Sequence, residues 1–580
     1  MNYCSSLYSF RRRKTREVIV GTGKNRLVIG GENPIVIQSM LTAKTSDTEN
    51  CVKQIQELAD AGCQLVRLTA PTIKDAENLR IISETVRANG YHVPLVADIH
   101  FTPEAAMEAA LWVEKIRINP GNYADSKQSQ TSYSEKEYQS ALDKIEEKFL
   151  PLIERCKKLN RALRIGSNHG SLSNRIMNRY GDTPLGMVES ALEYARIAHK
   201  HDFHNFVFSM KASSPKITIE AYRLLAAKLL EEGDDWNYPF HLGVTEAGLG
   251  TDGRIKSAVG IGALLADGIG DTIRVSLSED SIHELPVCRD LLQIVSMVTE
   301  GRELEHLNPD WDPYSYSRRE STEITIENSK LGGLQPVRVF MTEKQFAGAD
   351  KVELAKNNIT CEVVYHPREI IQVKIGEKLP EIPPSALVTI EDNTDVPVIS
   401  AFRWLASALR IVGQRNPILL KDTFNPQKDF SESPQLASSV LLGSLLCDGI
   451  GDAVLVRREE NPTVATLLAW NILQASGTRS FRTEYISCPS CGRTLFDIQK
   501  VIAKIKSRTQ HLQNIKIGIM GCIVNGPGEM ADADFGYVGG APGKVNLYVG
   551  KKPVKRGIPE DEAVDALVDL IKENGLWIDP

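Results

Sequence analysis

Between residue 17 and about residue 280, short apolar runs alternate with longer stretches in which apolar residues recur every three to four positions. Short apolar runs are typical of buried parallel strands, and the longer spacing is typical of amphipathic helices. The predicted strands are PIVIQSM, QLVRLTAP, PLVADIH, KIRINPG, ALRIGSN, NFVFSMKAS, FHLGVTEAG and DTIRVSL. Eight such strand–helix units in succession predict an α/β fold of the TIM (β/α)8 barrel type.

Two segments depart from this alternation. The runs REVIVGT and NRLVIGG predict a hairpin ahead of the first barrel strand, placed to plug the N-terminal face of the barrel. Residues 123–160 are long, polar and charged, and we interpret them as a surface loop followed by a helix that interrupts the barrel.

A second α/β region follows a polar linker, and its strand candidates are TEITIEN, PVRVFM, CEVVYHP, ALVTIED, NPILLKD and DAVLVRR. Within it, residues 437–452 align without a gap to residues 256–271, with ten of sixteen positions identical. Such a repeat indicates a duplicated barrel, or a piece of one, although chance reuse of a helix-to-strand turn is the alternative. At this alignment Arg274 corresponds to Leu455, so the second copy lacks that cation.

The last hundred residues contain the strand NIKIGIMGCIV, glycine-rich turns and a terminal amphipathic helix. They predict a small α/β domain. The domains expected are therefore a substrate-binding TIM barrel at 1–290, an inserted barrel-like structural domain at 300–478, and a C-terminal domain at 479–580.

Composition changes this picture little. The chain has 580 residues, a formal net charge of −6 and 24% charged residues, so it carries no electrostatic footprint for nucleic acid. It also lacks an apolar run long enough for a membrane span. Ten cysteines are scattered except for three near the C-terminus, which favours a reducing, cytoplasmic location. We interpret the arginine-containing first residues as a short basic tail.

Polar residues gather where the predicted barrel strands end, at the face on which TIM barrels place their active sites. They are Arg67, Asp98, His100, Arg117, Asn119, Arg164, Asn168, Lys211, Thr245, Glu246, Arg274 and Ser276. Any single arginine here is more often a salt-bridged surface residue. Five cations from five strands, however, repel one another unless an anion joins them. Because arginine forks pair with phosphate oxygens, the expected ligand is a small phosphate-rich molecule, specifically a diphosphate.

His100 and Glu246 are the candidates for proton transfer. A carboxyl group beside a bound diphosphate has its pKa raised by the anion, which suits proton donation near neutral pH. The alternative for Glu246 is simple charge balance among the arginines.

The C-terminal cysteines form the candidate metal site. Cys488 and Cys491 form a C-x-x-C, and Cys522 adds a third thiolate. Neither a cysteine nor a histidine follows Cys522, whereas Glu529 lies seven residues later across the turn signal of NGPG. A carboxylate is a harder ligand than a thiolate, so it would leave one iron of a [4Fe–4S] cluster weakly held.

Several of these motifs together resemble the 4-hydroxy-3-methylbut-2-enyl diphosphate synthases, iron–sulfur enzymes of the non-mevalonate isoprenoid pathway. The motifs are IQSM, VRLTAPT, LVADIHF, RINPGN, RIGSNHGSL, SMKAS, HLGVTEAG, GIGDTIRVSL, SCPSCGR and GCIVNGPGE. The resemblance is dense over 1–290 and 478–580, and the extra region at 300–478 is similar to the large, three-domain form. Two departures are the insertion after RINPGN and His169.

The resemblance implies one [4Fe–4S] cluster per chain, held by Cys488, Cys491, Cys522 and Glu529. It implies that 2-C-methyl-D-erythritol 2,4-cyclodiphosphate is opened and dehydroxylated with two electrons from ferredoxin or flavodoxin. The cations would then hold the diphosphate, and Glu246 would protonate the departing hydroxyl.

Two other functions stay open at this point, namely a zinc-stabilised barrel that binds a phosphorylated ligand without redox chemistry, and an iron–sulfur sensor. The protein is expected to be a monomer or a homodimer. In the short family form, the resemblance implies a site between the barrel of one subunit and the cluster domain of its mate. We therefore hypothesise that residues 300–478 replace the second subunit's barrel.

Overall fold

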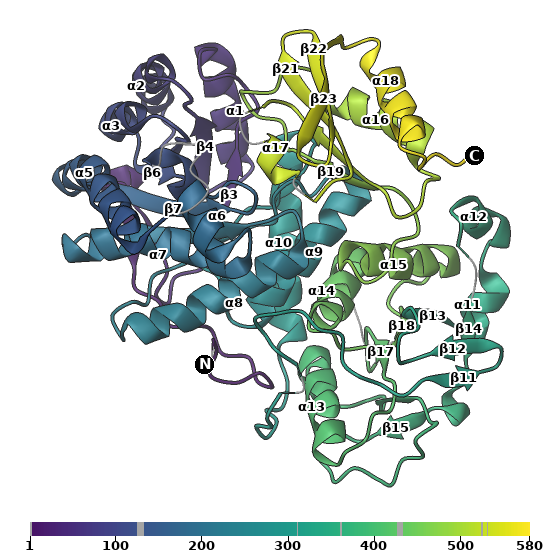
Figure 1. The fold of residues 1–580 in the computed structure, drawn as a ribbon. Coiled ribbons are helices and arrows are strands. Elements are labelled where there is room, and N and C mark those ends of the chain that lie inside the picture. The colour runs from purple at the N-terminus through teal and green to yellow at the C-terminus, as the bar shows by residue number, and fades with distance from the viewer. Residues whose placement is uncertain are drawn as a thin grey trace.

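The computed structural model describes residues 3–124, 133–309, 311–359, 362–425, 433–523, 526–530 and 532–579. Its largest sheet has eight parallel strands in the order β8-β7-β6-β5-β4-β3-β10-β9, and a parallel bridge between Phe208 and Phe240 joins its two ends. All eight predicted barrel strands are confirmed (Figure 1). They are β3 (Val36–Met40), β4 (Leu65–Thr69), β5 (Leu95–Asp98), β6 (Lys115–Ile118), β7 (Ala162–Asn168), β8 (Phe206–Lys211), β9 (His241–Leu242) and β10 (Thr272–Ile273).

One long helix follows each barrel strand, and together these helices surround the barrel. They are α1 (Thr48–Asp60), α2 (Ile73–Ala88), α3 (Pro103–Trp112), α5 (Glu135–Leu159), α7 (Pro184–Lys200), α8 (Pro215–Glu232), α9 (Gly250–Ala266) and α10 (Glu284–Val298). Short helical turns add η1 (Gly23–Asn25), α4 (Pro120–Tyr123), α6 (Asn174–Tyr180) and η2 (Ser281–His283).

The predicted hairpin is also confirmed, as the antiparallel strands β1 (Val18–Val20) and β2 (Leu27–Ile29). Val18, Val20 and Ile29 are buried against apolar residues near the N-terminal ends of the barrel strands, such as Leu65 and Val207. The hairpin therefore plugs that end of the barrel, and only the opposite end is left to hold a ligand.

Two interpretations from the sequence need correction. Helix α5 is not an addition to the surface, because its Ile145, Phe149 and Leu152 are fully buried and it takes the place of the barrel helix between β6 and β7. The remainder of the predicted loop, residues 125–132, lies outside the described residues. The N-terminal segment is not a free tail either, since Tyr8 is fully buried and its hydroxyl contacts Ser407 in the central region.

In its described residues, the central region contains six parallel strands after a second hairpin, and all six predicted strands are present. Two strands were not predicted, β12 (Ser329–Leu331) and β15 (Ile371–Val373). The others are β11 (Ile324–Ile326), β13 (Arg338–Thr342), β14 (Val363–Tyr365), β16 (Val388–Ile390), β17 (Leu419–Lys421) and β18 (Ala453–Leu455). The helices are α11 (Glu343–Gly348), α12 (Lys351–Lys356), η3 (Pro367–Glu369), α13 (Val398–Ile411), α14 (Pro434–Cys447) and α15 (Pro462–Ala475).

Matching contacts in the two regions support a duplicated barrel. Asp271 accepts hydrogen bonds from Thr15 Oγ1 and from the amide of Phe240. Asp452, its counterpart in the repeat, accepts the equivalent bonds from Ser321 Oγ and from the amide of Ile418. Together with the second hairpin, this arrangement gives the central region the form of an incomplete barrel.

The two repeated helices, α9 and α14, pack directly on each other between the barrel and the central region (Figure 1). A Cβ atom added at Gly262 would lie 2.5 Å from a Val440 methyl, and one added at Gly443 would lie 2.4 Å from a Val259 methyl. Gly262 and Gly443 are equivalent in the repeat, as are Val259 and Val440, so the contact has approximate two-fold symmetry.

The C-terminal domain is a five-stranded sheet with its own core, and Figure 1 shows it in yellow beside the barrel. Its strands are β19 (Glu484–Ser487), β20 (Lys516–Met520), β21 (Phe535–Ala541), β22 (Lys544–Val549) and β23 (Lys552–Pro559), and its helices are α16 (Ile498–Thr509), α17 (Gly526–Glu529) and α18 (Ala563–Glu573). The predicted fold class is confirmed, whereas the exact domain boundaries stay predictions. Across the described residues, every helix is too short or too polar to traverse a lipid bilayer.

Candidate active site

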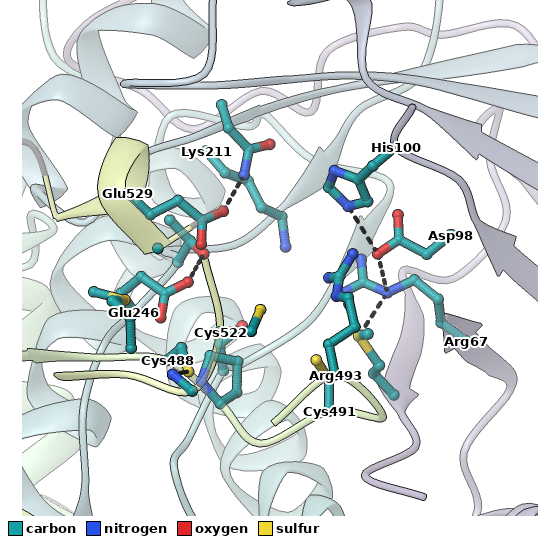
Figure 2. Close-up of a pocket in the computed structure, with 18 of the residues that line it drawn as sticks. Arg67, Asp98, His100, Lys211, Glu246, Cys488, Cys491, Arg493, Cys522 and Glu529 are labelled. Atoms are coloured by element: carbon teal, nitrogen blue, oxygen red, sulfur yellow. Dashed lines mark hydrogen bonds and ion pairs between the residues drawn. The ribbon is translucent and has the colours of Figure 1, made fainter. Parts of the chain in front are cut away.

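A pocket lies between the C-terminal ends of the barrel strands and the cysteine-bearing loops of the C-terminal domain (Figure 2). The barrel and the C-terminal domain of one chain both contribute to it. Its lining residues are Met40, Arg67, Asp98, His100, Arg117, Arg164, Asn168, Lys211, Thr245, Glu246, Arg274, Ser276, Cys488, Pro489, Cys491, Arg493, Thr494, Met520, Gly521, Cys522, Gly526 and Glu529. All five predicted cations and all four predicted metal ligands are among them.

Strand alternation explains why the barrel side chains converge. Ile116 and Ile118 belong to the apolar core between the sheet and its helices, so Arg117 between them faces the barrel interior. Leu163 and Ile165 place Arg164 in the same way.

One side of the pocket is closed where β19 meets the barrel. Residue Ala247 forms a parallel bridge with Ser487, directly after the pocket residue Glu246 and directly before Cys488. The Ser278 hydroxyl lies 2.9 Å from the Ser487 hydroxyl. This contact fixes the distance between Glu246 and the first cysteine.

Glycines permit the other closing contacts. A Cβ atom on Gly170, whose φ is +75°, would lie 1.9 Å from the carbonyl oxygen of Gly528. A Cβ atom on Gly492 would lie 2.7 Å from the carbonyl oxygen of Ala43. The loops that hold Glu529 and Cys491 therefore reach the barrel through direct backbone approach.

Three of the five cations already have acceptors in the protein. Arg274 forms a two-pronged ion pair with Glu284 of α10, at 2.8 and 3.0 Å, and the sequence had not suggested that partner. Arg117 donates to Asp98 at 3.0 Å. Arg67 lies 4.0 Å from Asp98.

Arg164 and Lys211 differ, because no acceptor for their charged groups lies within reach in the described part of the chain. Arg164 Nε and Nη1 are buried without a hydrogen bond, and Arg164 forms no ion pair with a described residue. Burial, together with the nearby Arg67, lowers the pKa of both Arg164 and Lys211 well below the usual values. These two cations have the strongest unmet requirement for an anion.

His100 is held as a neutral acceptor. Burial and the neighbouring Arg117 lower its pKa to about 3. Arg117 Nη1 lies 2.7 Å from His100 Nε2, and since a guanidinium only donates, that nitrogen must accept. A neutral imidazole in this position suits orientation of Arg117 better than proton donation.

The surroundings of Glu246 favour the protonated form of its carboxyl group. Burial and the facing carboxyl group of Glu529 raise the pKa of Glu246 well above its ordinary value. Glu529 also accepts a hydrogen bond from Asn168 Nδ2 at 2.7 Å. The backbone of Glu246 has φ of +52°, which is uncommon for a residue with a side chain and is held by the Ala247–Ser487 bridge.

The three thiols line the same end of the pocket as Glu529 (Figure 2). The sulfur of Cys488 accepts a hydrogen bond from the Gly521 amide at 3.1 Å. Among the described residues, His, Cys, Asp and Glu side chains form no group gathered closely enough for a single metal ion. Thiolates around one zinc ion would lie about 3.8 Å apart, whereas a larger cluster separates its ligands more widely.

Two differences from the sequence prediction concern single residues. Asn119 does not line the pocket, because its Oδ1 caps α4 by accepting from the Gly121 amide, so its role in substrate binding stays a prediction.

Arg493 was missed, although it follows Cys491 by two positions. It is a sixth cation in the pocket and comes from the C-terminal domain. Its position in the CGR motif, beside a predicted metal ligand, could have identified it from the sequence.

Fold and site together define a parallel-barrel enzyme whose anion-binding mouth is covered by a domain that presents thiols and a carboxylate. Residues 15–289 match the GcpE TIM-barrel domain, and residues 484–573 match the GcpE protein C-terminal domain. The chain belongs to this family, the 4-hydroxy-3-methylbut-2-en-1-yl diphosphate synthases.

Curated relatives are similar over the full length. A 4-hydroxy-3-methylbut-2-en-1-yl diphosphate synthase (flavodoxin) from Akkermansia muciniphila is 52% identical over 100% of this chain and 99% of its own. A chloroplastic enzyme of Oryza sativa, named with ferredoxin, is 41% identical over 100% of this chain and 89% of its own. Among solved structures, a dihydropteroate synthase from Xanthomonas albilineans matches 49% of this chain and 98% of its own at 14% identity, with a TM-score of 0.32.

Proposed function

We propose that this pocket binds 2-C-methyl-D-erythritol 2,4-cyclodiphosphate and converts it, with two electrons, to the linear allylic diphosphate. The observation that carries the proposal is the placement of several cations, the carboxyl group of Glu246 and three thiols around one pocket. The cations satisfy the diphosphate, and the other groups serve the carbon–oxygen bond that breaks.

Arg164 and Lys211 bind the diphosphate directly in this proposal, because both line the pocket and no hydrogen bond to a described residue satisfies Arg164 Nε and Nη1. Arg67, Arg117 and Arg274 keep their carboxylate partners and surround the anion with further donors. Asp98 orients Arg117, and His100 accepts from the same guanidinium, so neither competes for the ligand.

Glu246 donates a proton to the departing hydroxyl group. Its carboxyl group lies in the pocket, and burial together with the facing Glu529 raises its pKa well above the ordinary value. Asn168 and Ser276 are placed to contact the substrate, since both line the pocket.

Cys488, Cys491, Cys522 and Glu529 would hold one [4Fe–4S] cluster. Three thiolates and a carboxylate at one end of the pocket suit this group, and a single zinc ion would need a tighter arrangement. The bound cluster would supply the two electrons one at a time. An external donor is required, and the names of the relatives point to flavodoxin or ferredoxin. A cytoplasmic location and the absence of a nucleic-acid partner stay predictions.

Anaerobically purified protein tests this proposal. We expect a brown protein with absorbance near 400 nm that converts the cyclodiphosphate when a chemical reductant is added. Glu529→Ala should keep part of that absorbance through three thiolates but turn over poorly, with Glu560→Ala, directly after β23, as a matched control. A colourless zinc protein, or full activity of Glu529→Ala, would contradict the assignment.

A further inference from the structure

The barrel interior directly below the pocket is unusually polar. TIM barrels normally fill this space with branched apolar side chains. Here Ile116 and Leu242 belong to the core outside the sheet. By strand alternation, Lys115 of β6 and His241 of β9 therefore face the interior.

Both residues lie one layer below the anion-binding cations. Lys115 precedes the pocket residue Arg117 by two positions on the same strand. His241 precedes Gly243 by two positions, and a Cβ atom on Gly243 would lie 2.6 Å from Lys211 Nζ. The Lys211 amine thus lies over Gly243, with His241 beneath it.

Neither side chain has a hydrogen-bond partner among the described residues. Lys115 Nζ and both ring nitrogens of His241 are buried and unbonded, with exposures of 1% and 0% for the two residues. Buried polar groups without a partner are rare in proteins, and an unpaired ammonium in such a place costs several kcal/mol.

Within the described part of the chain, the titratable groups that act on the two residues are all basic side chains. Lys115 lies between Val96 of β5 and Ala162 of β7, and the charged groups facing it are Arg164 and Arg67. His241 pairs with Thr272 of β10 and faces Lys211, Arg164, Lys115 and Arg67. Burial and this repulsion lower the pKa of Lys115 and of His241 well below their usual values.

We propose that Lys115 and His241 form a proton-accepting layer: both are uncharged while the pocket is empty, and they take up protons when a diphosphate binds above them. This inference rests on the proposed function. A doubly charged anion over Arg164 and Lys211 cancels the repulsion that keeps the layer neutral. The protonated layer then attracts the anion, so proton uptake and substrate affinity reinforce each other.

The cyclodiphosphate is a suitable probe because each of its phosphates retains a single, strongly acidic group. The ligand itself therefore exchanges no proton near neutral pH, and any proton taken up on binding belongs to the protein. Calorimetric titration of the oxidised holoenzyme, without reductant, measures this number when it is repeated in buffers of different ionisation enthalpy.

We expect proton uptake by the unmodified enzyme, and a dissociation constant that rises about tenfold per pH unit for each proton taken up. Lys115→Met, which keeps the length of the side chain, and His241→Asn should each reduce the number of protons and flatten the pH dependence. Lys157→Met, on an exposed lysine, should change neither. Unaltered cluster absorbance checks that each variant is folded.

Binding of the cyclodiphosphate without proton uptake would overturn the inference and leave the proposed function standing. Proton uptake that is the same in both variants as in the unmodified enzyme would also overturn it. Failure of the unmodified holoenzyme to bind the cyclodiphosphate at all would instead overturn the proposed function, and the inference with it.

Discussion

At the scale of single residues, the partner of each cation decides its role. Five cations end barrel strands, but Arg274 is neutralised by Glu284 and Arg117 by Asp98. Arg164 has neither kind of partner among the described residues. Basic residues at the strand ends therefore predict a positively charged barrel mouth. The carboxylates around them determine which of these charges remain free to bind a ligand.

Arg164→Met should weaken binding of the cyclodiphosphate about 10- to 100-fold, because each charge-assisted hydrogen bond contributes about 1.5–3 kcal/mol. The cluster absorbance should not change, since Arg164 belongs to β7 and not to the thiol-bearing loops. Calorimetric titration and a visible spectrum measure the two effects. Arg26→Met, at an exposed position in the plugging hairpin, is the matched control. Loss of absorbance in Arg164→Met would count against the assignment of the anion site.

At the scale of elements, the repeated helices α9 and α14 join the barrel to the central region. Their glycines let the two backbones approach, and each glycine receives a valine of the other helix. Beside them, Arg223 of the barrel and Arg403 of the central region each contact both Asp267 and Asp448. Each arginine therefore forms one ion pair within its own region and one with the other region, and these buried pairs hold the two regions together.

Gly262→Ala should lower the apparent melting temperature, because its new methyl group would overlap Val440 and overpacking of this kind costs about 1–3 kcal/mol. Thermal unfolding followed by circular dichroism measures the change. The intrinsic preference of helices for alanine, about 1 kcal/mol, acts in the opposite direction.

The double variant Gly262→Ala/Val440→Ala is the control, since it removes the overlapping methyls. We expect Gly262→Ala to lower the melting temperature less when it is introduced into Val440→Ala than when it is introduced into the unmodified protein. If Gly262→Ala were more stable than the unmodified protein, the close approach of α9 and α14 would be refuted.

At the scale of the whole molecule, one chain supplies both halves of the pocket. The barrel and the C-terminal domain meet through Ala247 and Ser487, and through Gly170 and Gly528. The central region has an approximate two-fold relation to the barrel through α9 and α14. This supports our hypothesis that residues 300–478 replace a second subunit's barrel, so that a monomer is a complete enzyme.

Mixing a Cys522→Ala chain with a Lys211→Ala chain, under conditions that permit subunit exchange, should restore no turnover. Each parent lacks a group that only its own chain supplies in this arrangement. Activity assays before and after mixing measure the outcome, and spectra confirm that each parent is folded. Substantial recovery would mean that sites are shared between chains.

The sequence by itself determined the barrel, the second set of strands and the location of the chemistry. Apolar runs and helical spacing depend on local burial, which the order of residues encodes directly. The strand ends and the SCPSCGR motif then placed the cations and the thiols on particular loops. The strand β12 escaped notice because Ser329–Leu331 has no apolar run of its own, whereas β15 lies in IIQVKI, whose apolar alternation was an available signal.

Only the tertiary structure decided which groups meet. Glu284 on α10 neutralises Arg274, Asn119 caps α4, and Arg493 enters the barrel mouth from another domain. Burial and the proximity of like charges shift the pKa of Glu246, of Lys115 and of His241. Both quantities depend on contacts between segments far apart in the chain, and for that reason no local pattern in the sequence contains them.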